Sequence, residues 1–508
     1  MQGKKIYTEK LFTSFQLSDR VPQDNFYRRL KENVNLDFIS SDTKKYYGNC
    51  GQQSIDPVVF FKLMLVGYLE NIITDRKLIE HCSMRMDILF FLGYDIDEPL
   101  PWHSTISRTR QLYETSLFES IFNKVFNACV EKGMVSGHTQ AIDSAFVKAN
   151  ASMDSLEVKQ PAQPLDKHIE ELNLNNEQPY RKAKNDKSSD EQRMLTASEQ
   201  DLNELQTRYE YQDKVNKDRP GSGDEKAKYY SNKTHYSPTD PDAKISVKPG
   251  KPRQLNYMCS MAVDTSNHVI THIQADLADK KDSQYLIDIV NKTKQRINDN
   301  HLELLNIAAD TGYSSGENYN ILEKENINAW IPVHGQFKNE REGFIYNEKE
   351  DCYICPNNKK VVCKKTFIDK EGRKLKRYIT TRKDCKECPF KATCIGKNHE
   401  KKFDITYYHK EYQRAYERQH SRTGKYMKKK RQSTVEPVFG TLINFLGLRK
   451  INVRGQAGAH KVMTMAAIAY NIKKLLKFFS TKAIAHYKAI ELIKTDLFMI
   501  YIMRYELR

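Results

Sequence analysis

Three acidic residues that lie far apart in the sequence each stand beside an apolar run. Asp143 lies within 140–147, Asp310 follows the apolar run 304–309, and Glu436 opens the amphipathic segment 434–440. A carboxylate at the mouth of a buried strand costs free energy unless it is paired or bound to a cation. Carboxylates from three distant segments can meet only through tertiary structure, so these residues constrain the fold more than any other feature does.

The chain is long and strongly basic. Its 508 residues correspond to roughly two to four domains. Its 82 Lys and Arg residues exceed its 65 Asp and Glu residues, and the net charge of +17 favours a polyanionic partner. A basic protein with no such partner is the plain alternative. No apolar signal segment and no apolar stretch of about 18 residues is present, so we expect a cytoplasmic protein without a membrane span.

The first part of the chain has the pattern of successive short helices. Asp56 and Pro57 form a helix start, and an apolar stripe at helical spacing follows them. The segment 104–113 is rich in Ser, Thr and Arg, which is typical of a helix-turn-helix that binds DNA. Arg108 and Arg110 are the exposed candidates for DNA contact. An ordinary helical bundle with a charged outer face is the alternative interpretation.

From Thr139 onward the pattern changes to strands alternating with helices, which indicates an α/β core. Strands are predicted over 139–147, 257–263, 268–273, 304–309 and 329–333, and helices over 282–297 and 314–326. Residues 264–268 form a hairpin turn in this prediction. Catalytic groups of such sheets lie at the carboxyl ends of strands, which is where Asp310 stands.

Six of the ten cysteines fall between 352 and 394. Without a signal segment, cysteines in a chain of this size are expected to be reduced thiols, and the Cys-x2-Cys pair indicates a metal site. Tetrahedral Zn²⁺ takes four soft ligands, and the candidate set is Cys355, Cys385, Cys388 and Cys394. Cys352 and Cys363 are alternates. Six reduced cysteines packed within a small insertion remain the alternative.

Paired carboxylates and basic runs together fit chemistry on nucleic acid. Cleavage of a phosphodiester needs an activated water or hydroxyl and a stabilised leaving oxygen, and two Mg²⁺ ions supply both. Each acid alone is weak evidence, because an Asp at a strand end is more commonly a cap or turn residue. The run Lys428, Lys429, Lys430 and Arg431 precedes Glu436 and is a candidate for phosphate contact. A solvated helix face is the alternative for this run.

The segments 141–151, 309–315 and 433–442 resemble the three acidic motifs of bacterial insertion-sequence transposases of the DDE class. Segments 54–68, 100–107 and 452–455 also resemble them, and the similarity covers about 15–155 and 250–478. The resemblance implies an RNase H-like core in which Asp143, Asp310 and Glu436 bind Mg²⁺ or Mn²⁺. Related transposases have the pattern Tyr-x2-Arg-x3-Glu-x6-Lys. Here Tyr426 and Arg431 precede Glu436 at wider spacing and position 443 is Ile, so this pattern does not transfer.

These observations predict an α/β fold: an RNase H-like mixed sheet with flanking helices, an all-α N-terminal domain and a small Cys-rich insertion. The expected units are a helical DNA-binding domain (1–135), a catalytic core (136–152, 251–336 and 406–480), a charged insertion or linker (153–250), a zinc-ribbon-like insertion (337–405) and a C-terminal tail (481–508).

The resemblance implies a nucleoid-associated prokaryotic enzyme that acts on double-stranded DNA. It would bind the terminal inverted repeats of a mobile element, cleave with two Mg²⁺ ions and join the 3′ ends to target DNA. Bringing two ends together implies a homodimer on DNA. Two alternatives remain: a catalytically silent DNA-binding repressor derived from a transposase, and a standalone Mg²⁺-dependent nuclease.

Overall fold

The computed structural model describes residues 14–48, 52–161, 195–218, 230–247, 252–334, 343–370 and 372–478, with residues 2, 5 and 50. The expected tail over 481–508 and much of the charged insertion lie outside the described residues. Within the described ranges, every helix is too short or too polar to cross a lipid bilayer.

The N-terminal part is helical, as predicted. Asp56 accepts a hydrogen bond from the backbone N–H of Val58, and Pro57 occupies the first position of the longest apolar helix there. The elements in order are α1 (Leu17–Arg20), α2 (Phe26–Asn33), α3 (Phe38–Thr43), η1 (Lys44–Tyr46), α4 (Pro57–Leu69), α5 (Asp75–Ser83), α6 (Met86–Leu92), α7 (His103–Leu112) and α8 (Thr115–Glu131).

A mixed sheet forms the centre of the molecule. Its strand order is β10-β9-β1-β7, with β8 also paired to β7. β1 is antiparallel to β7 and parallel to β9, β7 is antiparallel to β8, and β10 is parallel to β9. The predicted hairpin is therefore confirmed. The strands are β1 (Thr139–Lys148), β7 (Gln254–Asp264), β8 (Ile270–Leu277), β9 (Asn306–Ala309) and β10 (Asn328–Trp330).

One further strand joins this sheet from a region that the sequence assigned to the charged insertion. β6 (Lys244–Ser246) pairs antiparallel with the start of β7. Nearby, the buried Asp240 accepts hydrogen bonds from the Tyr257 hydroxyl and the Gly455 backbone N–H, at 2.6 Å and 3.1 Å. The expected boundary at residue 250 is therefore too late, because a strand of three residues shows no periodicity that would distinguish it from a linker.

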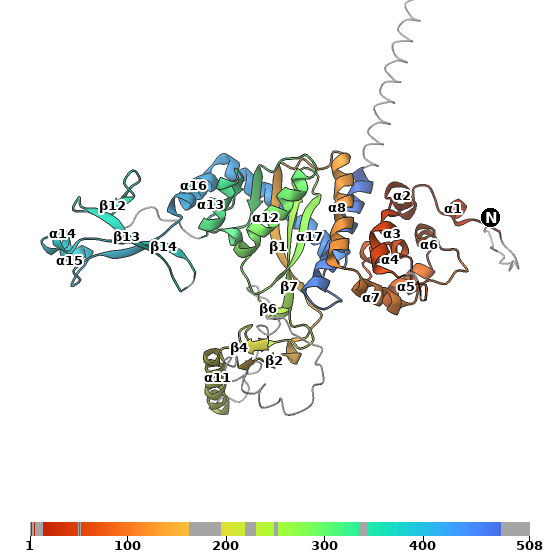
Figure 1. Cartoon of the computed structure of the whole chain (residues 1–508), viewed down its shortest axis with the longest axis horizontal. Helices are drawn as coiled ribbons and strands as arrows, with labels where there is room; N and C mark the ends of the chain where they lie inside the picture. Colours follow the sequence, from red (N-terminus) through yellow and green to blue (C-terminus); the bar gives the residue numbers. More distant parts are fainter. Residues whose placement is uncertain are drawn as a thin grey trace, which may run out of the picture.

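Helices cover both faces of the sheet (Figure 1). On one face, Ile142 packs with apolar residues of α12 (Asp282–Asn298), α13 (Gly316–Lys324) and α16 (His409–His420). On the other face, Ala141 and Val147 pack with apolar residues of α8, α17 (Arg422–Phe445) and a helix over 456–478. The neighbouring residues Ala141 and Ile142 belong to different cores because successive side chains of a strand point to opposite faces.

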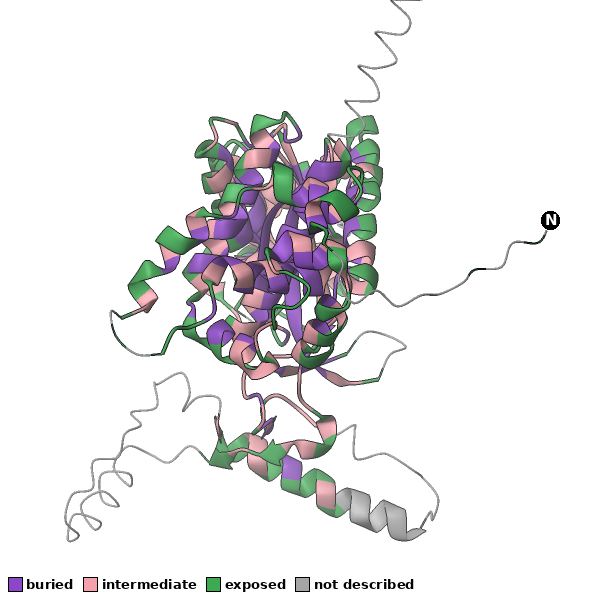
Figure 2. Ribbon diagram, turned by 90° about the vertical axis from the view of Figure 1, so that its right-hand side faces the viewer, coloured by how far each residue is buried: buried purple, intermediate pink, exposed green. Residues whose placement is uncertain are grey.

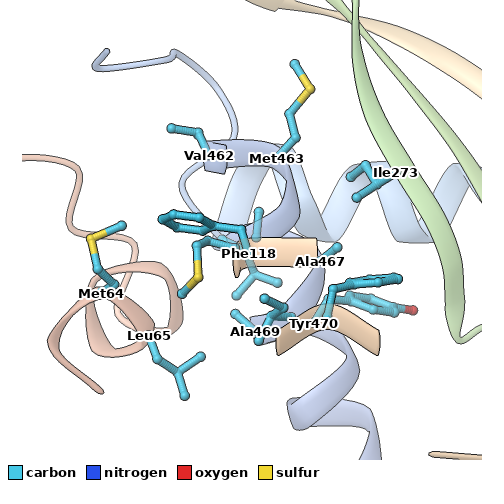
Figure 3. Packing of buried hydrophobic residues seen from close by; sticks show 14 of the residues in the cluster. Met64, Leu65, Phe118, Ile273, Val462, Met463, Ala467, Ala469 and Tyr470 are labelled. Atoms are coloured by element: carbon cyan, nitrogen blue, oxygen red, sulfur yellow. The ribbon is translucent and has the colours of Figure 1, made fainter. Parts of the chain in front are cut away.

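The second core continues into the N-terminal helices. Figure 3 shows Met64 and Leu65 beside Phe118, with side chains of the 456–478 helix such as Val462 between them and the sheet. The helical part and the sheet therefore share one apolar core. Buried residues are concentrated in this body, whereas the projecting helix α11 (Glu199–Asp218) is largely exposed where its side chains are described (Figure 2).

The Cys-rich region forms its own sheet and extends away from the body (Figure 1). Its strand order follows the sequence, and its small core contains Phe344, Tyr353 and Phe403. Its elements are β11 (Ile345–Asn347), β12 (Cys352–Ile354), β13 (Lys360–Ile368), β14 (Lys374–Ile379), α14 (Arg382–Lys386), α15 (Lys391–Cys394) and β15 (Lys402–Thr406). The minor elements are η2 (Met153–Ser155), β2 (Glu157–Val158), β3 (Gln160–Pro161), β4 (Thr196–Ala197), α11 (Glu199–Asp218), β5 (His235–Tyr236) and η5 (Thr311–Tyr313).

Candidate active site

Asp143 and Asp310 are neighbours on adjacent parallel strands. The register pairs Ile142 of β1 with Ala309 of β9, so the next residue on each strand is an aspartate. Asp143 Oδ1 accepts a hydrogen bond from the Ser144 backbone N–H at 2.9 Å, and Asp310 Oδ1 accepts one from the Thr311 N–H at 2.7 Å. Each side chain is thus held through one oxygen by the backbone N–H of the next residue, and the other oxygen of Asp143 accepts from Arg431.

The two carboxylates differ in environment. Burial raises the pKa of Asp143, Arg431 lowers it in part, and the negative charge of Asp310 raises it again. Asp310 is exposed at the end of its strand. A half-buried carboxylate beside a second carboxylate has an unfavourable charge, which a cation stabilises.

Arg431 is the side chain of α17 that reaches this pair. Its Nη1 donates a hydrogen bond to Asp143 Oδ2 at 2.8 Å, and the residue is only 8% exposed. The structure therefore places Arg431 against Asp143, away from the exposed Lys428 and Lys429 of the same basic run. The buried face of α17 explains why, because Arg431 lies on it together with Gly424, Met427, Thr434, Val435, Val438, Phe439 and Leu442.

Glu436 lies in the middle of α17 and does not open a helix as the sequence suggested. The basic run that precedes Glu436 belongs to the same helix, and Pro437 lies inside this helix. Glu436 follows Arg431 by five positions, which turns it about 140° around the helix axis, and it is exposed. Across the described ranges, no group of three or more His, Cys, Asp or Glu side chains is close enough to hold a metal ion. The fold thus brings Asp143 and Asp310 together and leaves Glu436 apart.

The basic candidates fall into two groups. Arg108, Lys428 and Lys429 are exposed, and Lys430 is partly exposed. Arg110 is buried, and the expectation that it is exposed is wrong. Its guanidinium donates to Asp75 Oδ1 at 2.6 Å and to Met64 Sδ at 3.2 Å, because α7 packs against α5 and α4.

Two residues that support the acid pair were not singled out from the sequence. The buried Tyr313 hydroxyl is hydrogen-bonded to Ser144 Oγ, which connects the segment after Asp310 to the residue beside Asp143. Burial raises the pKa of Tyr313 well above its ordinary value, so its hydroxyl stays protonated. At Gly312 an added Cβ would lie 2.8 Å from Asp282 Oδ2, so a larger residue in this turn would require the Asp282 side chain to shift. In the sequence, the only indication of a role for Gly312 and Tyr313 is their position shortly after Asp310.

The structure separates the six clustered cysteines into four and two. Cys355, Cys385, Cys388 and Cys394 line one small cavity between the sheet and the short helices α14 and α15. Burial raises the pKa of the Cys394 thiol, Lys401 lowers it in part, and the three other cysteines of this cavity raise it further. The alternates lie elsewhere, since the Cys352 thiol contacts Glu350 and the Cys363 thiol contacts the Lys365 carbonyl.

Two family models match the chain. A transposase domain (DUF772) matches residues 15–112, which contain α1 to α7. A transposase DDE domain matches residues 354–476, which contain most of the Cys-rich sheet, α16, α17 with Glu436 and nearly all of the last helix. Asp143 and Asp310 lie outside both matched ranges. A search of curated proteins found no match.

Proposed function

We propose that this chain, which belongs to the insertion-sequence transposases of the DDE class, cleaves DNA at the ends of a mobile element and joins the freed 3′ ends to target DNA. The observation that carries the proposal is the neighbouring position of Asp143 and Asp310 on parallel strands. The net charge of +17 supports DNA as the partner.

The donor chemistry of the acid pair fits a divalent cation such as Mg²⁺ or Mn²⁺. Both residues offer hard carboxylate oxygens, which Mg²⁺ prefers, and both are held by backbone hydrogen bonds. When bound, such cations activate the attacking hydroxyl and stabilise the leaving oxygen. In the proposal, Asp143 and Asp310 fix the position of the scissile phosphate, and Arg431 leaves Asp143 Oδ2 when the site is loaded.

Glu436 is the proposed third carboxylate. It lies within the matched DDE range, on the helix that packs against β1 and β9. Its side chain stands on the exposed flank of α17, so its participation requires a change in the position of this helix or in the Arg431–Asp143 contact. α17 carries Arg431 on its buried face and Glu436 on its exposed flank, so a rotation of this helix would replace the Arg431 side chain beside Asp143 with the Glu436 carboxylate.

The architecture of the core supports an RNase H-like assignment. The antiparallel strands β1, β7 and β8 are followed in the sequence by β9 and β10, which lie parallel on the other side of β1. In the proposal, residues 136–152, 251–336 and 406–480 build this core, and part of the 153–250 segment adds β6 to it.

Recognition of the element ends is assigned to the helical domain over residues 1–135. Arg108 on α7 is exposed and suited to contact DNA, and Lys428 and Lys429 on α17 are suited to phosphate contacts nearer the acids. Because a transposition reaction joins two ends, we propose a homodimer on DNA.

The four-cysteine cavity is proposed to bind a structural Zn²⁺ ion. Four thiols are the donor set that tetrahedral Zn²⁺ takes in closed sites. These four line one cavity but are not drawn together closely enough to hold an ion in this structure, so the proposal requires them to move inward when zinc binds. Purified protein is then expected to contain about one zinc per chain, and Cys385→Ser should lose it and unfold the Cys-rich sheet at lower temperature. Atomic emission spectroscopy measures the zinc content. Cys363→Ser is the matched control and should retain zinc, whereas retention by Cys385→Ser would contradict the assignment.

A strand-cleavage assay tests the proposed function. The substrate is a duplex carrying the element end with its flanking DNA, and Mg²⁺ is added or withheld. Mg²⁺-dependent nicking at the element boundary, followed by joining to a target duplex, is the expected result. Nicking without joining would indicate a standalone nuclease, and binding to the end without nicking would indicate a silent DNA-binding protein.

A further inference from the structure

The β13–β14 hairpin of the Cys-rich sheet concentrates positive charge. Residues 359–379 contain nine Lys or Arg residues and two Asp or Glu residues. This short segment therefore carries a large share of the net charge of +17 of the whole chain. Charges of one sign at this density repel one another, and a polyanion bound against them removes the repulsion.

The carboxylates of the region neutralise only part of this charge. Arg377 is paired with Asp404, with 2.7 Å between its Nε and the carboxylate oxygen. Lys364, Lys365 and Lys374 are exposed, and among the residues that the structure describes no carboxylate lies within ion-pairing distance of them. These three ammonium groups are therefore available to an anionic partner.

The hairpin projects beyond the strands on either side of it. β12 pairs only with the first residues of β13, and β15 pairs with β14 only as far as Leu375, whereas β13 and β14 stay paired to Ile368 and Lys374. Lys365 and Ile368 are three residues apart on β13, so the row of Lys365 and the row of Ile368 and Lys374 face opposite sides. The projecting part of the hairpin thus presents a lysine on each face.

Contacts with the body hold the Cys-rich sheet in a fixed direction. α13 begins shortly after Asp310, and Arg414 of α16 is paired with Glu323 of α13 at 2.6 Å. At the start of α16, the His409 ring stacks on Tyr346 of β11, with ring centroids 5.5 Å apart. The central sheet, which carries the acid pair, lies between the Cys-rich sheet and the helices α1 to α7 (Figure 1).

We propose that the β13–β14 hairpin binds the phosphate backbone of the DNA that flanks the element, beyond the point of cleavage. This inference rests on the proposed function and adds where the DNA outside the element lies. A duplex that is held by the helical domain and cleaved at the acid pair continues toward the opposite end of the molecule, where the hairpin projects.

The chemistry of the hairpin fits this partner. Flanking DNA has no fixed sequence, so it is held by contacts that do not read bases, and contacts between lysine and phosphate are of this kind. The major groove of B-DNA is about 12 Å wide and admits a two-stranded ribbon. With the hairpin in this groove, Lys365 faces one of the two bordering backbones and Lys374 faces the other.

The salt dependence of binding tests the site without cleavage. The full chain binds two duplexes in EDTA: one carries the element end that borders the gene of this protein together with its flanking DNA, and the other stops at the element boundary. Each lost phosphate contact reduces the slope of log K against log salt concentration by about 0.9. On the flanked duplex, Lys365→Gln and Lys374→Gln should each show this reduction and the double variant about twice as much. On the shorter duplex, no slope should change.

The matched control is a double variant with the same change in charge, Lys324→Gln with Lys473→Gln. These lysines are exposed on α13 and on the helix over 456–478, and their removal should keep the slope on both duplexes. Hydroxyl-radical footprinting then locates the contact. The unaltered protein should protect the flanking DNA, and the hairpin double variant should lose this protection.

The outcomes separate this inference from the proposed function. An unchanged slope of the hairpin double variant on the flanked duplex, with normal binding and nicking, would overturn the inference and leave the proposed function standing. An equal reduction on both duplexes would place the hairpin on the element DNA and overturn its assignment to the flank. Failure of the unaltered protein to bind either duplex would overturn both.

Discussion

Asp310→Asn is expected to reduce strand cleavage about a thousandfold or more, with DNA binding in EDTA unchanged. The substitution keeps the size of the side chain and the hydrogen bond from the Thr311 N–H, and it removes the negative charge that would hold a divalent cation. Asp143→Asn should have the same effect: its Oδ1 can still accept from the Ser144 N–H, whereas the amide nitrogen in place of Oδ2 removes the charge and the contact with Arg431. A gel assay of nicked product over time measures both.

Asp288→Asn is the matched control, because this aspartate is exposed on α12 on the other face of the sheet. It should cleave at the rate of the unaltered protein. Glu436→Gln tests the third carboxylate in the same assay, and loss of cleavage is expected there as well. Full cleavage by Asp143→Asn and Asp310→Asn would reject the acid pair as the catalytic site, whereas full cleavage by Glu436→Gln alone would reject only the third ligand.

The second large effect is expected in the acid stability of the protein and comes from His272. This histidine is buried on β8, where its Nδ1 accepts from Arg296 at 3.0 Å and its Nε2 donates to Gln274 at 2.8 Å. Burial, with the charge of Arg296, lowers the pKa of His272 to about 3. The imidazole ring is therefore neutral in the folded protein at both pH 7 and pH 5.

The sign of the pH dependence follows from the two pKa values. The unfolded chain takes up a proton near pH 6.5, whereas the folded protein does so only near pH 3, so the free energy of unfolding falls as the pH drops below 6.5. Between pH 7 and pH 5 this one group removes about 2 kcal/mol. His272→Gln keeps one acceptor and one donor and cannot titrate, so its melting temperature should fall less between these pH values than that of the unaltered protein.

Thermal unfolding at pH 7 and pH 5, followed by circular dichroism, measures the difference. His399→Gln is the control, because His399 is exposed in the Cys-rich region and its removal should leave the pH response unchanged. An equal loss of stability in His272→Gln and in the unaltered protein would show that the acid response comes from other groups. Three other histidines with pKa values lowered chiefly by burial, His235, His268 and His409, add smaller contributions of the same sign.

The sequence predicted the main elements because their signals are local. The alternation in β1, the turn between β7 and β8, and the apolar stripes of α4 and α12 are patterns of a few consecutive residues. Each of these elements is found within a few residues of its predicted bounds. β6 was missed and α17 was begun too late, since a three-residue strand has no period and Glu436-Pro437 reads as a helix start.

The candidate site could be predicted only in part. The sequence identified Asp143 and Asp310, and the parallel pairing of β1 with β9 makes them neighbours. It gave no indication that Arg431 would pair with Asp143, or that Arg110 would be buried against Asp75. A lysine or arginine in a basic run is expected to face solvent unless a buried carboxylate is known to lie opposite it.

By itself, the sequence determined which residue types carry chemistry and which segments form strands and helices, because side-chain charge and hydrophobic period are properties of the chain alone. Only the tertiary structure decided which charges meet. The register of β1 against β9 brings two aspartates together, and the packed face of α17 turns Arg431 inward and Glu436 outward. These contacts join residues far apart in the chain, and their energies depend on distances that no local pattern encodes.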